Sequence, residues 1–398
     1  MRKVSRRPEL EPLEDRVTPA RIVVHALADG ASMPIPASHV APNLRSAIDH
    51  SAAGDEIDLD GGVYTLSSEL FVTHNLTIRN AAGGTSTINA GQHGRVFEIV
   101  TGTNVSLSGL TITGGRDPNQ GGGIRNLGTL TVTNCTITGN FTFGGGGILN
   151  AGTLTLSGST VSGNTASGNG GGIFNVGTLT VTTSTVAGNT APSGNGGGVL
   201  NTATLTVSAS TFSGNSANVS GGGLYNAGTL SLADSTLAGN TGGVFGGGVY
   251  TAGTALLVND TVTRNTARFG GGLALGSPFA TGRVWNTLVA LNTATTGPDV
   301  YGTVVSLGHN LIGNTAGATG FSTAKGDLLN VPAASVGLGP LASNGGPTQT
   351  VRLLPGSAAI DRGDDAVLTS SLLRLTTDQR GNPRRVGAHV DVGAYEAP

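Results

Sequence analysis

The chain has 398 residues, a formal net charge of −2 and 67 glycines, whereas aromatic residues make up only 4% of it. A charge this close to zero excludes an electrostatic grip on nucleic acid or on an anionic membrane surface. Cys135 is the one cysteine, so no disulfide can form within the chain. No apolar run approaches the ~18 residues that a membrane-spanning helix needs.

Residues 1–20 read MRKVSRRPELEPLEDRVTPA, a basic and then acidic stretch. The stretch lacks the apolar core of a standard secretory signal peptide. Its run from Leu10 to Arg16, followed by Pro19 and Ala20, resembles a leader that precedes many exported bacterial surface proteins. The resemblance implies export to the cell surface or beyond, while a solvated disordered tail is compatible with the same composition.

Residues 21–70 are predicted to form an N-terminal cap and a first coil. A short strand is expected at Arg21–Val24, and a short helix at residues 43–49, with Leu44, Ala47 and Ile48 on one face. A solenoid must shield the open edge of its first rung. This helix is the segment that can do so.

The segment from Gly54 to Leu66 starts the coiling and contains closely spaced aspartates. Its Gly-Asp turn and the Gly-x-Tyr strand that follows resemble the opening segment of pectate-lyase-like β-helix proteins. Asp58 and Asp60 project from the same strand face, where they could bind calcium. The alternative is a solvated outward face beside the apolar Ile57 and Leu59. No other cofactor is expected.

Residues 71–314 are a repeat array. Gly-Gly-Gly followed by Ile, Val or Leu occurs seven times at intervals of 24 to 26 residues, and a period of ~20–50 residues indicates a solenoid, propeller or array. Within one period, Thr178–Thr182 alternates polar and apolar residues as a strand buried on one face does. A propeller blade would need roughly 40 residues, and the helical side of a leucine-rich repeat is missing.

Three short strands per coil, with Gly and Asn at the bends, predict an all-β fold: a right-handed parallel β-helix. The period also predicts one buried column of leucines, namely Leu130, Leu154, Leu179, Leu205 and Leu230.

Two columns of asparagine follow the same period. Because a buried amide without a partner costs about 1–3 kcal/mol, asparagines stacked in successive coils are expected to bond to one another. We interpret both columns as structural ladders, not as ligands. The first is Asn126, Asn150, Asn175, Asn201 and Asn226, and the second is Asn140, Asn164, Asn189, Asn215, Asn240 and Asn265.

A third column is expected to point outward from the middle of the Ile173–Asn175 triplet and its equivalents. Large apolar residues stacked every ~4.8 Å would form a stripe, which suits sugar rings or a partner protein. The alternative is that the C-terminal region or a loop folds back over it. The stripe consists of Leu149, Phe174, Leu200, Tyr225 and Tyr250.

Residues 315–398 lose the period and form a predicted C-terminal cap. Five spaced motifs, Ser306–Asn314, Leu338–Thr348, Leu354–Gly363, Thr377–Arg384 and Asp391–Glu396, closely resemble the C-terminal region of bacterial choice-of-anchor Q proteins. The repeats resemble, more loosely, those of polymorphic outer-membrane proteins. These resemblances imply an exported β-helix surface protein and transfer no catalytic residues.

Relatives often continue into a sorting tail, whereas this sequence stops at Ala397 and Pro398, so no C-terminal anchor is expected. The acids and arginines of the tail could hold calcium or, alternatively, form ion pairs that fix a cap over the last rung. They are Asp361, Asp364, Asp365, Asp378 and Asp391 with Arg362, Arg380, Arg384 and Arg385.

Pectate lyases and polygalacturonases share the predicted fold, but function depends on the site. Polysaccharide cleavage needs paired carboxylates or a metal with a base, and the 108 residues from Asn126 to Ala233 contain no Asp, Glu, His, Lys or Arg. No catalytic residue is therefore predicted. We expect a non-enzymatic, exported surface or matrix protein that binds a polysaccharide or a partner protein through the stripe. The alternative is a carbohydrate-active enzyme with a site at a rod end, near Asp55–Asp60 or in the tail.

Overall fold

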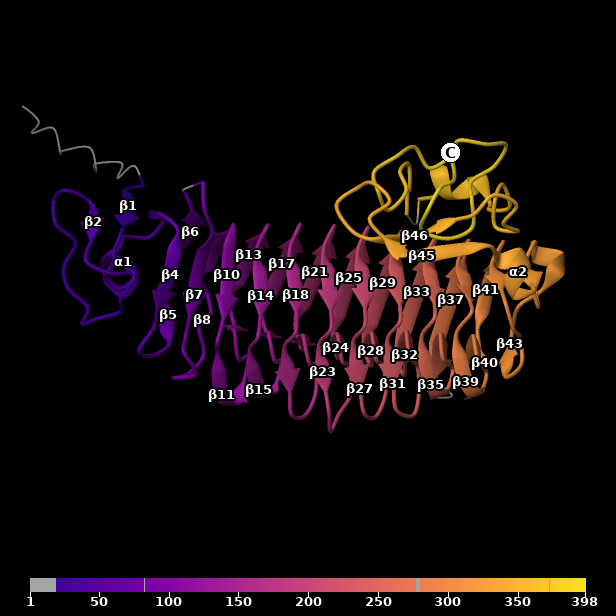
Figure 1. The fold of residues 1–398 in the computed structure, drawn as a ribbon, viewed down its shortest axis with the longest axis horizontal. Coiled ribbons are helices and arrows are strands. Elements are labelled where there is room, and N and C mark those ends of the chain that lie inside the picture. The colour runs from indigo at the N-terminus through magenta and orange to yellow at the C-terminus, as the bar shows by residue number, and fades with distance from the viewer. Residues whose placement is uncertain (1–18, 82, 277–279, 372) are drawn as a thin grey trace, which may run out of the picture.

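The computed structural model describes residues 19–398 except residues 82, 277–279 and 372, so the predicted leader lies almost wholly outside the described residues. The described chain forms a rod of stacked coils with an irregular region against one side (Figure 1). Strands at the same place in successive coils pair in parallel. The prediction of an all-β parallel β-helix is confirmed.

Sheets A and B lie on consecutive sides of each coil. Sheet A contains, in spatial order, β2 (Val40–Ala41), β1 (Arg21–Val24), β3 (Glu56–Leu59), β6 (Leu76–Asn80), β9 (Asn104–Ser108), β13 (Thr129–Thr133), β17 (Thr153–Ser157), β21 (Thr178–Thr182), β25 (Thr204–Ser208), β29 (Thr229–Ala233), β33 (Thr254–Val258), β37 (Thr281–Trp285) and β41 (Val305–Gly308). Sheet B contains β4 (Gly62–Thr65), β7 (Ser86–Asn89), β10 (Leu110–Thr113), β14 (Thr136–Thr138), β18 (Thr160–Ser162), β22 (Thr185–Ala187), β26 (Thr211–Ser213), β30 (Thr236–Ala238), β34 (Thr261–Thr263), β38 (Leu288–Ala290), β42 (Leu311–Ile312) and β44 (Leu328–Leu329).

Sheets D and C complete the coil. Sheet D contains β11 (Arg116–Gln120), β15 (Phe141–Gly144), β19 (Thr165–Ala166), β23 (Thr190–Ala191), β27 (Ser216–Ala217), β31 (Thr241–Gly242), β35 (Thr266–Phe269) and β39 (Thr293–Thr296). Sheet C contains β5 (Leu70–Val72), β8 (Phe97–Ile99), β12 (Ile124–Asn126), β16 (Ile148–Asn150), β20 (Ile173–Asn175), β24 (Val199–Asn201), β28 (Leu224–Asn226), β32 (Val249–Thr251), β36 (Leu273–Leu275), β40 (Val300–Thr303) and β43 (Ala318–Thr319).

Two details differ from the expected repeat. Most coils have four strands instead of three, because sheet D adds a strand as short as two residues, and a strand that short has no alternation to recognise. The sheets also extend beyond residues 71–314, since β1 and β44 belong to sheets A and B.

The interior of the rod is a stack of apolar columns. The five leucines of the predicted column pair in register, strand by strand, and none is more than 1% exposed. Their position in one buried column is therefore as predicted.

The glycine triplets allow neighbouring coils to approach closely. The first glycine takes a left-handed conformation, as Gly170 does with a φ of +66°, and glycine adopts this φ without steric cost. The second glycine has no room for a side chain, since a Cβ on Gly171 would lie 2.4 Å from the carbonyl oxygen of Gly197 in the next coil.

Both asparagine columns form continuous hydrogen-bonded ladders. Asn126 Nδ2 donates to Asn150 Oδ1 at 2.7 Å, and the same bond repeats along the column to Thr251 Oγ1. In the second column, Asn140 Nδ2 donates to Asn164 Oδ1 at 3.0 Å, and the bonds continue through Asn292 to Asp299 Oδ1. A third ladder, from backbone N–H to side-chain oxygen, runs through Ser159, Ser184, Ser210, Ser235, Asp260, Thr287, Asn310 and Asp327.

The N-terminal cap contains the predicted helix, α1 (Leu44–His50). Asn43 caps it by accepting a hydrogen bond from the backbone N of Ser46 at 2.8 Å, as an N-cap asparagine does. Leu44, Ala47 and Ile48 are buried.

Residues 333–398 form the C-terminal region, which follows the last coil and its 3-10 turn η1 (Thr323–Lys325). The region contains α2 (Ala333–Val336), the antiparallel pair β45 (Leu338–Ala342) and β46 (Thr350–Leu353), and the 3-10 turn η2 (Asp365–Leu368). It was expected to cover the last rung, but Figure 1 shows it along the flank of the rod. Its contacts reach from Ala209 to His309, because its polar groups bond to the corners of several coils.

Candidate binding surface

The outward column on sheet C has the predicted register. Its residues pair coil by coil through β12, β16, β20, β24, β28, β32 and β36 and continue to Tyr301 on β40. The stripe is not continuously exposed, however, because Leu149 and Leu200 are only 4% and 5% exposed. Each leucine lies between longer side chains of the adjacent coils. Phe174, Tyr225 and Tyr250 keep partial exposure.

Aromatic rings gather at the C-terminal end of this column. The centroids of Tyr225 and Tyr250 lie 4.9 Å apart, those of Phe245 and Phe269 lie 5.2 Å apart, and those of Phe269 and Tyr301 lie 5.4 Å apart. Phe245 also contacts Tyr250 and Tyr301 at 5.8 and 6.1 Å. We call these five residues the aromatic cluster; all five are partly exposed.

An open depression of about 510 Å³ adjoins the aromatic cluster. Phe245, Leu275 and Tyr301 supply its apolar lining, while Thr303 and Thr319 contribute hydroxyl groups that bond to each other at 2.8 Å. Aromatic faces beside hydroxyl groups suit a sugar ring, which presents an apolar C–H face and a polar rim.

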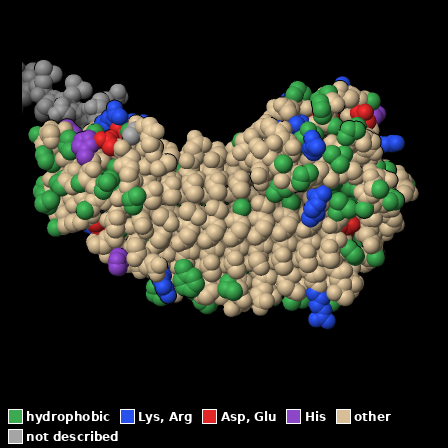
Figure 2. Space-filling view, in the orientation of Figure 1, with side chains coloured by type: hydrophobic (Ala, Val, Ile, Leu, Met, Phe, Trp, Pro, Cys, Tyr) green, Lys and Arg blue, Asp and Glu red, His purple; other side chains and the backbone are tan. Residues whose placement is uncertain are grey.

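The surroundings of the cluster contain little charge. The guanidinium of Arg268 lies 5.2 Å above the ring of Phe269. Burial raises the pKa of Tyr225 and of Tyr250, so both phenols keep their protons at neutral pH. Figure 2 shows that the middle of the rod is almost free of charged side chains on the visible face, with charge gathered at the two ends.

Residues that precede the glycine triplets, and not the C-terminal region, cover part of the stripe. Phe245 and Phe269 each stand directly before a glycine triplet, Phe269 as the last residue of β35, and Phe245 contacts Tyr250. The C-terminal region contacts sheet B instead, where Gln379 bonds to Thr211 and Thr236. The stripe and the C-terminal region therefore belong to different sides of the rod.

The predicted calcium ligands do not form a cation site. Asp58 is 1% exposed and pairs with Arg79 at 2.7 Å and with Arg21, while Asp60 pairs with His25. Burial alone would raise the pKa of Asp58, but the hydrogen bonds from Arg79 and Arg21 lower it overall. Two guanidinium groups occupy the oxygens that a cation would need. Within the described residues, no group of three or more His, Cys, Asp or Glu could hold a metal.

The tail acids have partners of several kinds. Asp378 pairs with Arg380 at 2.7 Å and Asp365 with Arg385 at 3.2 Å. Asp364 Oδ2 accepts from Trp285 Nε1 on the rod at 3.3 Å. The carboxylates of Asp361 and Asp391 accept backbone N–H groups.

A polar cleft of about 600 Å³ lies between the last coils and the C-terminal region. His389 Nδ1 lies 3.2 Å from Asp365 Oδ2, and His309 Nδ1 lies 2.9 Å from the carbonyl oxygen of Arg362. Each imidazole therefore donates through Nδ1 when neutral, which leaves Nε2 available as a base. Asp361 also lines the cleft. The cleft lies in the tail, which is one of the two places where the alternative prediction puts an enzymatic site.

Sequence reasoning missed three members of the aromatic cluster: Phe245, Phe269 and Tyr301. A signal was present, since Phe245 and Phe269 each stand directly before Gly-Gly-Gly. Tyr301 lies one coil beyond Ala274, whose small side chain interrupts the column of large residues.

No protein-family model and no curated protein matches the chain. In the part of the chain that is described, no helix is both long and apolar enough to span a membrane. Among solved structures, the chain is similar to the crystal structure of pectate lyase Pel9A, with a TM-score of 0.62 and 15% sequence identity over 96% of this chain and 98% of that one. At this identity the similarity shows a pectate-lyase-like β-helix fold and nothing about the activity of this chain.

Proposed function

We propose that this protein is an exported polysaccharide-binding β-helix, and that its aromatic cluster holds a neutral glycan at or outside the cell surface. The observation that supports this most directly is the cluster itself, five rings beside an open depression of about 510 Å³. The leader-like N-terminus and the choice-of-anchor Q motifs of the tail support export. None of the described residues that line the depression is charged, which supports a neutral ligand over an acidic one.

The test is retention of the purified protein on a panel of insoluble neutral polysaccharides. The double variant Phe245→Ser and Tyr301→Ser removes two rings at the depression and should lose about fivefold or more in affinity, since each stacked aromatic pair contributes roughly 0.5–1.5 kcal/mol.

The matched control is Phe71→Ser. Phe71 belongs to the same outward column of sheet C, is 51% exposed, and lies at the other end of the rod. It should bind as the unmodified protein does. A double variant that folds and binds normally would contradict the proposal.

A second candidate function is proton transfer to or from a polysaccharide in the polar cleft. The pairing of His389 with Asp365 beside an open cavity supports it, because a carboxylate that orients an imidazole is a common general-base arrangement. Release of reducing or unsaturated ends from polyuronates, lost in both His389→Gln and Asp365→Asn, would establish it. If no reducing or unsaturated ends are released from any of the polyuronates, this second function is ruled out.

A further inference from the structure

The corner between sheets A and B changes residue type along the rod. Its residue takes a left-handed φ in successive coils, and before Asp234 the position holds, in chain order, Gly109, Asn134, Gly158, Thr183 and Ala209. In the next four coils it holds polar residues. We call these the docking row: Asp234, Asn259, Asn286 and His309.

Every member of the docking row meets the C-terminal region. With its amide oxygen turned toward the guanidinium, Asn259 accepts from Arg384 Nε at 2.8 Å. Asn286 Oδ1 accepts from the backbone N of Asp364 at 2.8 Å. Asp234 faces Arg384, and His309 bonds to the backbone of Arg362. These four side chains therefore line the contact with the C-terminal region.

The corner between sheets B and D changes in the same coils. Glycine fills it up to Gly239, and Arg264 and Leu291 follow with left-handed φ values of 55° and 62°. Arg264 donates to the carbonyl oxygen of Leu338 at 3.3 Å, and Leu291 packs against an apolar cluster that joins sheet B to the C-terminal region. Two corners of the rod are thus adapted to the docked region.

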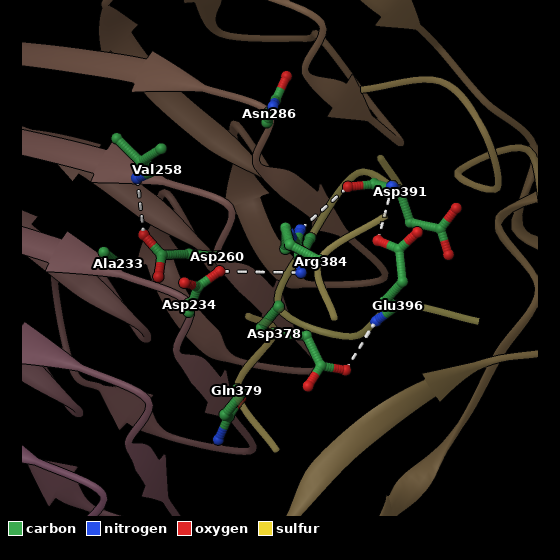
Figure 3. A network of polar contacts seen from close by, with 12 residues as sticks. Ala233, Asp234, Val258, Asp260, Asn286, Asp378, Gln379, Arg384, Asp391 and Glu396 are labelled. Carbon is green, nitrogen blue, oxygen red and sulfur yellow. Dashed lines mark hydrogen bonds and ion pairs between the residues drawn. The ribbon is translucent and has the colours of Figure 1, made fainter. Parts of the chain in front are cut away.

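The centre of this contact holds more carboxyl groups than cations (Figure 3). Arg384 is fully buried, and around it lie four carboxyl side chains that are at most 6% exposed: Asp234, Asp260, Asp391 and Glu396. Arg384 Nη1 lies 3.7 Å from Asp234 Oδ1. Neither of these two atoms has a hydrogen-bond partner among the described residues.

The neighbouring cations are already paired. Arg380 pairs with Asp378 and lies 3.7 Å from the ring centroid of Tyr395. Arg385 pairs with Asp365 at the outer surface, where His389 also contacts Asp365. In the described structure, Arg384 is therefore the cation that faces the four buried carboxyl groups, and full ionisation of all four would leave the centre strongly negative.

We propose that the C-terminal region is a pH-dependent latch, which docks tightly on the rod while the buried carboxyl groups are protonated and loosens when they ionise. This inference is independent of glycan binding, since the docking row and the aromatic cluster lie on different sides of the rod.

The direction follows from the pKa values. Burial raises the pKa of Asp234 and of Glu396 to about 7 and also raises the pKa of Asp260 and Asp391. A group whose pKa is raised in the docked state contributes stability that is complete below its free value and is lost as the pH rises through the docked value. For Asp234 this window runs from its ordinary pKa of 3.8 to about 7. Each such group weakens docking by up to about tenfold per pH unit within that window.

Hydrogen exchange of the full chain tests the latch at two interface amides. Gly393 N donates to the carbonyl oxygen of Asn286 and Ala394 N to Thr261 Oγ1, both at 2.9 Å. After correction for intrinsic rates, their protection should fall at least tenfold between pH 5 and pH 8. The Ile173 amide, bonded within the rod to Gly198, should show no such change. Constant protection, or protection that increases with pH, would overturn the proposal.

Isosteric variants assign the effect to the buried groups. Asp234→Asn and Glu396→Gln should each make the pH dependence shallower, whereas Asp49→Asn, an exposed aspartate on α1, should leave it unchanged. If Asp234→Asn does not fold, the pH dependence of protection in Glu396→Gln is the test. A pH dependence as steep as in the unmodified protein in every folded variant would refute the role of these carboxyl groups.

Discussion

A ladder asparagine uses every polar atom of its side chain. Asn189 Oδ1 accepts from the backbone N and from Nδ2 of Asn164, both at 3.0 Å. Its own Nδ2 donates to the carbonyl oxygen of Val161 at 2.9 Å and to Asn215 Oδ1 at 3.0 Å. The side chain is completely buried, so these four bonds offset its desolvation.

Replacing this residue should destabilise the rod through its partners. Asn189→Ala leaves the backbone N–H of Asn164 and one Nδ2 hydrogen of Asn164 without their acceptor, and each buried unpaired group costs about 1–3 kcal/mol. Asn215 Oδ1 still accepts from the backbone N of residue 189. Urea denaturation should show the loss, while Thr180→Ala, on the outer face of β21, should change stability by less than about 0.5 kcal/mol. Equal midpoints for the two variants would contradict the role given to the ladder.

At the scale of the coil, the second glycine of a triplet sets how closely two rungs can stack. Gly171→Ala would place a Cβ 2.4 Å from the carbonyl oxygen of Gly197, a contact that the backbone cannot relieve without separating the coils. We expect a large fall in melting temperature, of the size seen when a core is overpacked by about 1–3 kcal/mol or more.

Gly188 supplies the matched control. It has a left-handed φ of +61° but open space where a Cβ would lie, so Gly188→Asn, which tolerates this φ, should melt within a few degrees of the unmodified protein. If Gly171→Ala melts as high as Gly188→Asn, close stacking is not the reason for the triplets.

The repeat could be predicted because the same chemistry returns in every coil. The Leu179 column and the Asn189 column are visible in the sequence since their neighbours in space are also their equivalents one period away. Alternation shows which face a residue takes but not the size of its neighbours, so the burial of Leu149 and Leu200 was not foreseen.

The contacts of the C-terminal region could not be predicted from the repeat. Asp234 and Arg384 are far apart in the chain and no period connects them, so Asp234 looked like an isolated charge at the end of a charge-free array. The loop-rich tail likewise gave no periodicity from which its place on the flank could be inferred.

For the whole molecule, the two ends should respond to pH in opposite directions. In the N-terminal cap, burial alone would raise the pKa of Asp29, but hydrogen bonds from Arg45 and Ser67 lower it to about 2, and the pKa of Asp58 is also lowered. Groups with lowered pKa values contribute stability that is lost as the pH falls through the folded value. The cap should therefore loosen in acid, as the pH falls from the ordinary aspartate pKa of 3.8 toward about 2, where the C-terminal latch is closed.

Hydrogen exchange of the α1 amides in acid would check this difference. Their protection should fall toward pH 2 while that of Gly393 and Ala394 is retained, and Asp29→Asn should remove most of the acid dependence of the cap. Loss of protection at both ends together in acid would show a single global unfolding in place of two local ones.

The asparagine ladders also have a direction. Each Nδ2 donates toward the coil that follows in the sequence, so every amide both receives from the coil before and gives to the coil after. The last amide of a row must give to a group that need not give onward: one asparagine ladder ends on the hydroxyl of Thr251 and the longer one on the carboxylate of Asp299. An acid in register with an asparagine column therefore ends the chain of side-chain donors, because a carboxylate accepts from the coil before it and has no proton to give to the coil after it.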